Sequence, residues 1–574
     1  MAVTAKPANT VRAHDRERAP MSTHIERLAK GIVDCTSSIP ADVLQRARFQ
    51  LLGLLGATYA GRLSDHAALI VAEGKRIAGN QGDAWCFGGD RRTTASAALF
   101  VNAALACCHD FDDYLFLAHP GLSSVHTAVA VGLETGADLD RCLRAIVMAD
   151  EVMGRMGAST LIGPQNGQLW THVHGVGAAV AAGVLLELDE EAMAHAIALT
   201  FSQPNFALWP GFTRGGGKAL SAAIPAVMGL SCARLAKDGM RSAADALEHP
   251  AGFWARFAFM PLPQMLGGWG ETWLTRTLSI KSVPGCAYVS AVWEAVSQVL
   301  AAHAEKHGEG VLNWQDVTSI DVDVQALSLG MEQLVGASLF GEQGRIDSTA
   351  LNFSIPATVA LTLTHGRLDA ADMTRSRLAQ HQGDLKALEA RTAVRHSARM
   401  TAELVQPFVG AMHFDRLLRD LPKGELMAAL ARVGWMLRKT GRGGPARLGL
   451  LETLGNLWGP ALSLLHAARP EPFEMGDVDL LGFEFRFAAR VAVHGRDFSY
   501  EAQVNRPRGA AMASVEELEA VATQKFRSEA NRFLAPATVE STIRKILTGN
   551  GSLAEVFAEV ARPLESGLPI IGEA

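Results

Sequence analysis

Apolar residues recur every three to four positions from about residue 23 to residue 300, which predicts a series of amphipathic helices. Pro40 suits the first turn of one helix, and Asp189 can cap another. The apolar run is broken at residues 215–218, where three glycines precede Lys218. Two apolar stripes carry this prediction: Leu44, Ala47, Leu51, Leu52 and Leu55 in an early helix, and Val173, Val176, Val180 and Val184 in a later one.

The period of the apolar pattern changes to two near residue 316, which predicts β-strands. Alternation returns in residues 480–504, where residues 494–497 suit a hairpin turn. Ser514 and Glu517 then have the spacing of a capping box at the start of a further helix. The alternating apolar positions are Ile320, Val322 and Val324 in the first strand segment, and Phe483, Phe485 and Phe487 in the second.

These patterns predict a mainly α fold, with a large all-helical domain and a smaller α/β lid domain. We expect a disordered N-terminal tail over residues 1–22, followed by the helical domain over residues 23–300. The lid domain is expected over residues 301–530, with a helical insertion at about residues 405–470, because strand-like segments bracket that stretch. We expect residues 530–565 to return to the helical domain.

Composition restricts the function classes. The chain has 574 residues, enough for two or more domains, and a formal net charge of −6 without a basic block for nucleic acid. Its seven cysteines include no CxxC pair, which argues against a disulfide framework, a zinc site or an iron–sulfur cluster. We find no secretory h-region and no apolar run of roughly 18 residues. A cytoplasmic protein with no nucleic-acid or membrane partner is expected.

The stretch CCHDFDDYLFLAHPG, residues 107–121, is the most unusual in the chain. It places Asp110, Asp112 and Asp113 within four positions, with His119 shortly after, between segments suited to burial. Asp110 and Asp113 would share one face if the stretch were helical. Three interpretations are open: a solvated helix end, which local evidence favours; a magnesium site, which lacks a second metal-binding motif; and an acid–base site, with His119 on a turn.

Two other stretches offer candidate site residues. His172 and His174 stand at the start of a helix, where an i, i+2 pair can face one ligand only before regular helix begins. One core and one surface histidine is the commoner outcome. Lys218 follows glycines that allow close approach, and Lys281 lies before a Pro-Gly turn. A lone lysine is usually a solvated charge, but these two are well placed to bind a carboxylate.

In their order and spacing, these stretches resemble the MmgE/PrpD family, which includes 2-methylcitrate dehydratase, cis-aconitate decarboxylase and iminodisuccinate epimerase. The resemblance covers most of residues 23–400 and 475–560. It includes the segments HIERLAKGIVDCTSSIPADVLQRARFQLLGLLGATYAG, GGGKALSAAIPAVMGLSCARLAKDGM, SIKSVPGCAYVSAVWEAV and LNFSIPATVALTLTHGRLD. It implies a helical domain with an α/β lid, a homodimer, and cofactor-free chemistry on small polycarboxylates. We separately expect no bound metal at Asp110, Asp112 and Asp113, because the sequence has no second metal-binding motif.

The resemblance also assigns site residues. It places Asp110, His119, Lys218 and Lys281 on the family's active-site positions. Leu169-Trp170-Thr171 stands where the family has H-x-T, so His172 or His174 would take over by a shift, and we count His172 among the catalytic candidates. Tyr114 replaces a common threonine, Cys107 a histidine, and Cys286 a histidine of some members. The residues expected to bind substrate are Asp113, Tyr114, Thr171, His174 and Cys286.

The implied activity is a lyase reaction on a di- or tricarboxylate, most simply elimination of water. Fixed lysines would stabilise the developing negative charge, and one with a lowered pKa could act as the base. His119 would protonate a leaving hydroxyl, while Asp110 would orient His119 or Lys218 or be the base itself. Decarboxylation or epimerisation would need nearly the same residues. A scaffold that kept the fold and lost catalysis is the rival interpretation.

Overall fold

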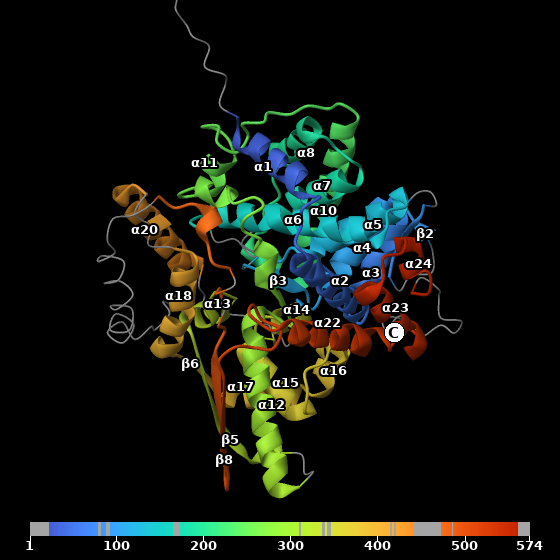
Figure 1. The fold of residues 1–574 in the computed structure, drawn as a ribbon. Helices are drawn as coiled ribbons and strands as arrows, with labels where there is room; N and C mark the ends of the chain where they lie inside the picture. The colour runs from blue at the N-terminus through green and yellow to red at the C-terminus, as the bar shows by residue number, and fades with distance from the viewer. Residues whose placement is uncertain are drawn as a thin grey trace, which may run out of the picture.

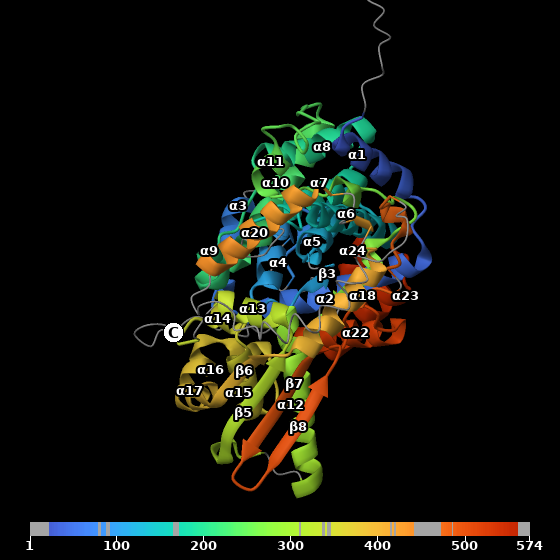
Figure 2. The same ribbon diagram turned by 90° about the vertical axis from the view of Figure 1, so that its left-hand side faces the viewer.

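The computed structural model describes residues 22–78, 82–87, 92–116, 118–164, 171–308, 312–335, 339–340, 346–413, 416–417, 421–440, 472–480, 482–484 and 486–560. The fold is mainly α, as the sequence predicts. A helical body forms the upper part in Figures 1 and 2, and a small sheet with its helices forms the lower part. The expected N-terminal tail and most of the second half of the expected insertion lie outside the described residues.

The helical body is built on helices that are buried almost all round. α4 and α7 consist mainly of alanine, valine, glycine and leucine, so neighbouring helices can approach them closely on every side. Where α7 meets α10, a Cβ at Gly229 would collide with the carbonyl oxygen of Gly175. The central helices are α2 (Ala41–Gly61), α4 (Ala95–Cys107), α5 (Gly121–Thr135), α6 (Leu139–Ser159), α7 (Val173–Leu185) and α10 (Leu220–Lys237).

Shorter elements surround these helices. Asp189 caps α8 as expected, because its side chain accepts the N–H of Ala192 at 2.8 Å. Among the described residues, Gly215–Lys237 is long and apolar enough to cross a membrane, but 61% of its most apolar window is buried inside the protein, as in a core helix. The surrounding elements are α1 (His24–Cys35), α3 (Ala67–Ala78), β1 (Ala84–Trp85), β2 (Arg92–Thr93), α8 (Glu190–Ser202), α9 (Trp209–Thr213) and α11 (Phe253–Phe257).

The lower part contains a four-stranded sheet in the order β6-β5-β7-β8. β5 (Val317–Val324) is parallel to β6 (Thr392–His396) and antiparallel to β7 (Ala489–Gly495), which forms a hairpin with β8 (Ser499–Val504). The predicted strand around residue 320 is confirmed. The predicted hairpin forms too, but its turn is shifted to residues 496–498, because His494 and Gly495 still belong to β7. Phe483 and Phe487 are buried but precede β7, and Phe485 lies outside the described residues.

Helices cover this sheet and connect it to the body. α12 packs on β7 and β8, and α15 packs on α12 (Figure 2). The helices between the body and the C-terminal helices along the chain are α12 (Ala287–His307), α13 (Ala326–Val335), α14 (Ser348–Leu351), α15 (Ile355–His365), α16 (Arg375–Gln380), α17 (Gln382–Arg391), α18 (Ala398–Ala411) and α20 (Lys423–Thr440). α20 and the end of α18 fall within the expected insertion.

The C-terminal helices α22 (Val515–Ala530), α23 (Pro536–Thr548) and α24 (Leu553–Phe557) return to the helical body. α22 packs along α2, and buried residues from Ala513 onward join the same hydrophobic core. The return therefore begins before the expected residue 530, although the domain boundaries themselves stay a prediction. Only half of the expected capping box forms: Ser514 accepts the N–H of Glu517, but the Glu517 carboxylate binds Arg506.

A buried ion pair fastens α6 to the segment before the second part. Glu151 and Arg155 form a salt bridge with both side chains 1% exposed. Glu151 also accepts the N–H groups of Leu274 at 2.9 Å and Thr275 at 2.8 Å, and Arg155 donates to the carbonyl of Thr272 at 2.8 Å. Removing one partner leaves an uncompensated buried charge.

We expect Glu151→Ala to lower the free energy of unfolding by about 3–5 kcal/mol, because Arg155 would stay buried without its carboxylate. Urea denaturation measures this change. Glu73→Ala is the matched control, since the Glu73–Arg76 pair is solvent-exposed and worth about 0–1 kcal/mol. Equal stability losses in the two variants would contradict the prediction.

Candidate active site

The aspartate-rich stretch forms a tight turn where α4 ends. Asp110 has a φ of 48°, a left-handed conformation that aspartate tolerates better than most residues. Its carboxylate is buried and accepts hydrogen bonds from the Nζ atoms of Lys218 at 3.2 Å and Lys281 at 3.1 Å. Two ammonium groups from distant parts of the chain thus meet on one carboxylate.

A short strand pair brings Lys281 to this turn. β3 (Asp113–Leu115) pairs antiparallel with β4 (Leu278–Ile280), and Asp113 lies opposite Ile280. The residues just beyond this pair, Asp112 and Lys281, are therefore neighbours, and Lys281 Nζ lies 2.9 Å from Asp112 Oδ1. Lys281 Nζ also donates to the backbone oxygen of Asp110 at 2.6 Å. With the bond to the Asp110 carboxylate, all three donors of Lys281 are engaged.

Lys218 reaches the site from the glycine turn before α10. This turn is a short 3-10 helix, Gly215–Ala219, in which a Cβ at Gly217 would collide with the carbonyl oxygen of Gly211. The Lys218 ammonium lies 5.0 Å from the centre of the Phe212 ring and 5.7 Å from that of Phe353. Among the described residues, its hydrogen bonds beyond Asp110 comprise a long contact to the Cys107 sulfur at 3.7 Å, so Lys218 keeps donor capacity that Lys281 lacks.

His119 completes a charged cluster, which consists of Asp110, Asp112, His119, Lys218 and Lys281. Its Nδ1 donates to Asp112 Oδ2 at 2.7 Å, which fixes the orientation of the ring. The His119 side chain is 14% exposed, whereas those of Asp110, Asp112, Lys218 and Lys281 are at most 3% exposed. Within the described part of the chain, Nε2 forms no hydrogen bond, so it remains available for proton transfer.

The charges of the cluster depend on one another. Burial alone would lower the pKa of Lys218 and of Lys281, but the adjacent carboxylates outweigh burial and raise both pKa values. Burial likewise would raise the pKa of Asp110 and of Asp112, yet the ammonium groups hold both below the ordinary value. Neither lysine therefore has the lowered pKa that a general base would need.

The same side chains have the spacing of metal ligands. One ligand atom from each of Asp110, Asp112 and His119 lies within 4.8 Å of the others. The Lys281 ammonium lies between the two carboxylates and supplies the positive charge that a divalent cation would bring. The expectation of no metal here stays a prediction, which elemental analysis of the dialysed protein tests.

Residues 26–262 match the family model of the MmgE/PrpD N-terminal domain. The matched N-terminal part of the chain belongs to the MmgE/PrpD family. No curated protein matches it. The matched residues include Asp110, His119 and Lys218, whereas Lys281 lies beyond them.

The structure distinguishes between the two candidate histidines. His172 lies among aromatic rings, with its centroid 4.8 Å from that of Phe253 and stacked on Phe206, and neither of its nitrogens has a hydrogen-bond partner among the described residues. His174 Nδ1 lies 2.9 Å from the hydroxyl of Ser123 on α5, and His119 is among the charges that act on it. Burial lowers the pKa of each to about 3. The charges of the cluster therefore act on His174, whereas the contacts of His172 are with aromatic rings.

The remaining predicted residues have different positions. Asp113 points into the body, where its carboxylate accepts hydrogen bonds from Gln50 at 2.5 Å and from the N–H of Gly121 at 3.1 Å. Burial, followed by the charge of Asp112, raises the pKa of Asp113 to about 6. Asp113 thus anchors the start of α5, just after His119, and the geometry does not bring it to a ligand. Asp110 and Asp113 share no helix face, because α4 ends at Cys107.

Three predicted substrate-binding residues are neutral groups. Tyr114 lies opposite Ser279 in the β3–β4 pair, and Cys286 directly precedes α12. Burial raises the pKa of each to about 12, so the phenol and the thiol are uncharged at neutral pH. Thr171 is buried just before α7. Their role in binding stays a prediction.

The sequence analysis assigned no site role to two side chains that contact this region. Asp112 binds both Lys281 and His119, and its place between two other aspartates was the available signal. Lys525, on α22, donates to the backbone oxygen of Phe111 and lies 4.0 Å from the centre of the Phe111 ring. Nothing in the local sequence sets this lysine apart from a solvated one, because only the packing of α22 on α2 buries it.

The buried Lys525 predicts a pH-dependent stability. Burial lowers its pKa to about 7, so the folded protein holds this amine neutral at pH values where the unfolded chain binds a proton. Stability is therefore lost as pH falls from about 10 toward 7, by up to about 1.4 kcal/mol per pH unit. Lys525→Met should remove this part of the slope in urea denaturation, whereas exposed Lys306→Met should not. Parallel stability curves for wild type and Lys525→Met would exclude this effect.

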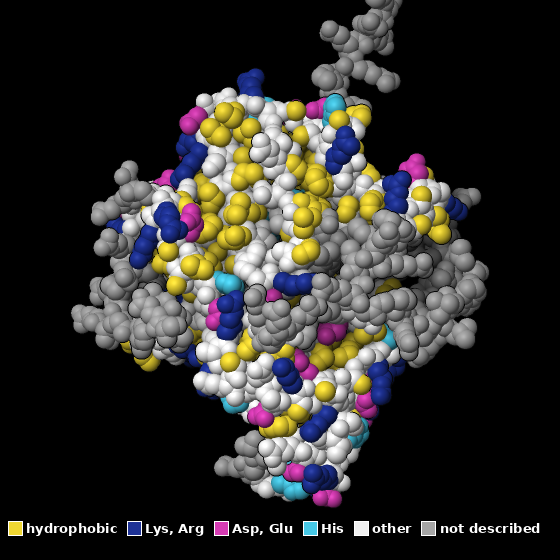
Figure 3. All heavy atoms as spheres, turned by 180° about the vertical axis from the view of Figure 1, so that it is seen from behind, with side chains coloured by type: hydrophobic (Ala, Val, Ile, Leu, Met, Phe, Trp, Pro, Cys, Tyr) yellow, Lys and Arg dark blue, Asp and Glu magenta, His cyan; other side chains and the backbone are white. Residues whose placement is uncertain are grey.

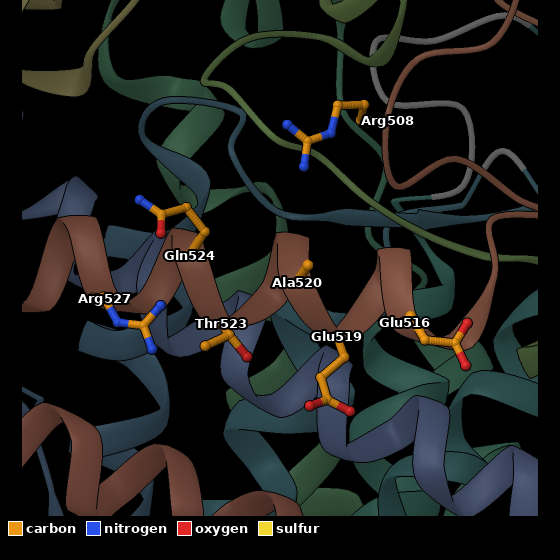
Figure 4. A pocket seen from close by; sticks show the side chains of 7 residues that line it. All are labelled: Arg508, Glu516, Glu519, Ala520, Thr523, Gln524 and Arg527. Atoms are coloured by element: carbon orange, nitrogen blue, oxygen red, sulfur yellow. The ribbon is translucent and has the colours of Figure 1, made fainter.

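The opposite side of α22 carries a surface groove of about 440 Å³ (Figure 4). Its lining is polar and of mixed charge, and Arg527 pairs with Glu540 at 2.5 Å. None of the charged cluster residues lines it, so we do not assign it to the site. The lining residues are Arg508, Glu516, Glu519, Ala520, Thr523, Gln524 and Arg527.

Proposed function

We propose that this MmgE/PrpD protein is a cofactor-independent hydro-lyase that acts on a small di- or tricarboxylate. The family contains lyases and isomerases, which supports an enzyme. The observation that carries the proposal is the meeting of two buried ammonium groups on Asp110, beside a histidine held by Asp112.

Lys218 is the group proposed to bind a substrate carboxylate. It remains protonated and keeps a donor beyond Asp110, whereas every donor of Lys281 is engaged. A fixed ammonium in a dry site stabilises negative charge strongly, because water does not screen it. Lys281 then acts by keeping Asp110 and Asp112 ionised and in place.

His119 is the proposed acid–base group. The Asp112 carboxylate holds Nδ1–H, so Nε2 can take a proton from carbon or give one to a leaving hydroxyl. Elimination of water needs both transfers, and a single histidine can serve them in turn when the two groups leave on the same side. The two lysines and two aspartates cancel in charge, so a protonated His119 gives the cluster one net positive charge.

A carboxy-lyase or an epimerase of the same family is the alternative, because His119 and Lys218 would serve those reactions too. A non-catalytic scaffold is opposed by the ionised groups, whose burial is costly unless it has a use. Neutral Tyr114 and Cys286 favour a substrate other than 2-methylcitrate, bulkier or less charged.

We further propose a homodimer, as family membership suggests. Figure 3 shows hydrophobic side chains gathered on the helical part of one face. Exposed large apolar residues on α10 include Ile224, 49% exposed, and Leu235, 40% exposed. Light scattering on the purified protein measures the mass in solution, and a monomer at micromolar concentration would contradict this proposal.

The test of the activity is a panel of hydroxy-acids and unsaturated acids, including citrate, cis-aconitate and 2-methylcitrate, analysed by mass spectrometry. Loss or gain of water supports the hydro-lyase, and loss of carbon dioxide supports the carboxy-lyase. Exchange of a carbon-bound proton with deuterated water, with no other change, supports the epimerase. If no carboxylate reacts or stabilises the protein thermally, the scaffold interpretation stands.

A further inference from the structure

One short segment of the second part contacts the three turns that carry Asp110, Lys218 and Lys281. Residues 347–353 contain α14, which lies where the helical body meets the lower part in Figures 1 and 2. At its start, Asp347 accepts the N–H of Gly215 at 3.1 Å, and Thr349 donates its hydroxyl to the Gly215 carbonyl at 2.7 Å. These bonds fix the glycine turn that precedes Lys218.

At the end of the segment, Asn352 joins the other two turns. Its side-chain Nδ2 donates to the carbonyl of Cys108 at 3.1 Å, two residues before Asp110. Its backbone oxygen accepts the N–H of Cys286 at 2.8 Å, in the turn that follows Lys281. Asn352 is fully buried, and its Oδ1 atom has no hydrogen-bond partner in the part of the chain that the structure describes.

The two turns also touch each other, because the N–H of Gly285 donates to the carbonyl of His109 at 2.9 Å. Asn352 therefore closes a small loop of hydrogen bonds around the Asp110 turn and the Lys281 turn. The strand pair that aligns these turns is only three residues long, and Asp110 is in a left-handed conformation. Such a turn keeps its geometry only where neighbouring bonds impose it.

We propose that Asn352 is a positioning residue, which acts through the Cys108 carbonyl and the Cys286 amide to hold Asp110 and Lys281 at their hydrogen-bonding distance. The remainder of residues 347–353 does the same for Lys218. The proposal rests on the proposed function in one respect, since it assigns this geometry to catalysis. The side chain of Asn352 is fully buried and donates its Nδ2 hydrogen bond to the Cys108 carbonyl, so water does not compete for this bond.

Two substitutions separate the side-chain bond from simple filling of space. Asn352→Asp keeps the shape but replaces the donor by an acceptor facing a carbonyl, and Asn352→Leu keeps a similar volume without any polar atom. The matched control is Thr362→Val, which deletes a buried hydroxyl that bonds only to the Thr358 carbonyl within α15. Circular dichroism verifies that each variant is folded.

Hydrogen–deuterium exchange measures, without any substrate, whether Asn352 stabilises the two turns. We expect exchange at the Gly285 and Cys286 amides to rise about tenfold in both Asn352 variants, as for one lost hydrogen bond, and to stay at the wild-type rate in Thr362→Val. If the Asn352 variants fail to fold, Thr349→Val provides the second test, with faster exchange expected at the Lys218 amide. Wild-type exchange in all folded variants of residues 349 and 352 would overturn the proposal.

Kinetics on a substrate found in the carboxylate panel completes the test. Displaced turns should lower kcat by about tenfold or more with little change in KM, because misplacement of reacting groups affects the transition state more than binding. Faster amide exchange with unchanged kcat would overturn the proposed effect of Asn352 on catalysis. If the Asn352 variants show faster amide exchange but the wild-type protein transforms no carboxylate, the proposed function is wrong, whereas the structural role of the Asn352 hydrogen bonds stands.

Discussion

Lys218→Met is expected to lower turnover of the carboxylate substrate by about 10²–10³-fold, the usual effect of losing one fixed donor to a developing negative charge. Methionine has a similar length and is apolar, so the aromatic surroundings formed by Phe212 and Phe353 can still pack around it. Asp110 keeps its second partner, Lys281, which limits the loss of stability.

The measurement is kcat and KM for the variant beside Lys237→Met, which removes an exposed lysine at the end of α10. We expect the control to behave as wild type. Lys218→Arg restores the charge but not the compact ammonium geometry, so it should recover only part of the activity. If kcat of Lys218→Met lies within about twofold of the wild-type value, another group stabilises the developing charge.

His119→Gln is expected to abolish proton transfer and to lower kcat by about 10²–10⁴-fold, the range typical of general acid–base catalysis. Glutamine can keep a hydrogen bond to Asp112 but cannot shuttle a proton near neutral pH. Asp112→Asn should show a smaller loss, because the imidazole would remain but without the carboxylate that orients it.

Exchange of substrate carbon-bound hydrogen with deuterated water isolates the proton-transfer step from the rest of the reaction. The wild-type enzyme should catalyse this exchange and His119→Gln should not. His249→Gln alters an exposed histidine and is the control. Exchange at the wild-type rate in His119→Gln would transfer the role of base to another group.

The sequence predicted the helical body and the sheet because their signals are long. Stripes of valine in α7 and the alternation in β5 extend over several turns or residues, so local periodicity suffices. The pairing of β3 with β4 gave no such signal, since each strand has three residues. That pairing is what makes Asp112 and Lys281 neighbours, so the central ion pair could not be derived from periodicity.

Candidate site residues were recoverable only in part. Asp110, His119, Lys218 and Lys281 do converge, and the resemblance had placed them on active-site positions. The choice between His172 and His174 depended on which of them faces α5. The spacing of two residues at the start of a helix does not determine this. Asn352 and Lys525 act on backbone carbonyls more than 200 residues away, and such contacts leave no local pattern.

The packing of α22 on α2 has a consequence for biosynthesis. α2 emerges early from the ribosome, but the helix that covers it and supplies Lys525 is made only near the end of translation. Until then, the face of α2 that α22 covers and the Phe111 carbonyl that Lys525 binds lack these partners. The matched N-terminal segment, residues 26–262, also precedes Lys281 and Asn352. A nascent chain of that length would therefore hold Asp110, His119 and Lys218 without the partners that Lys281 and Asn352 supply.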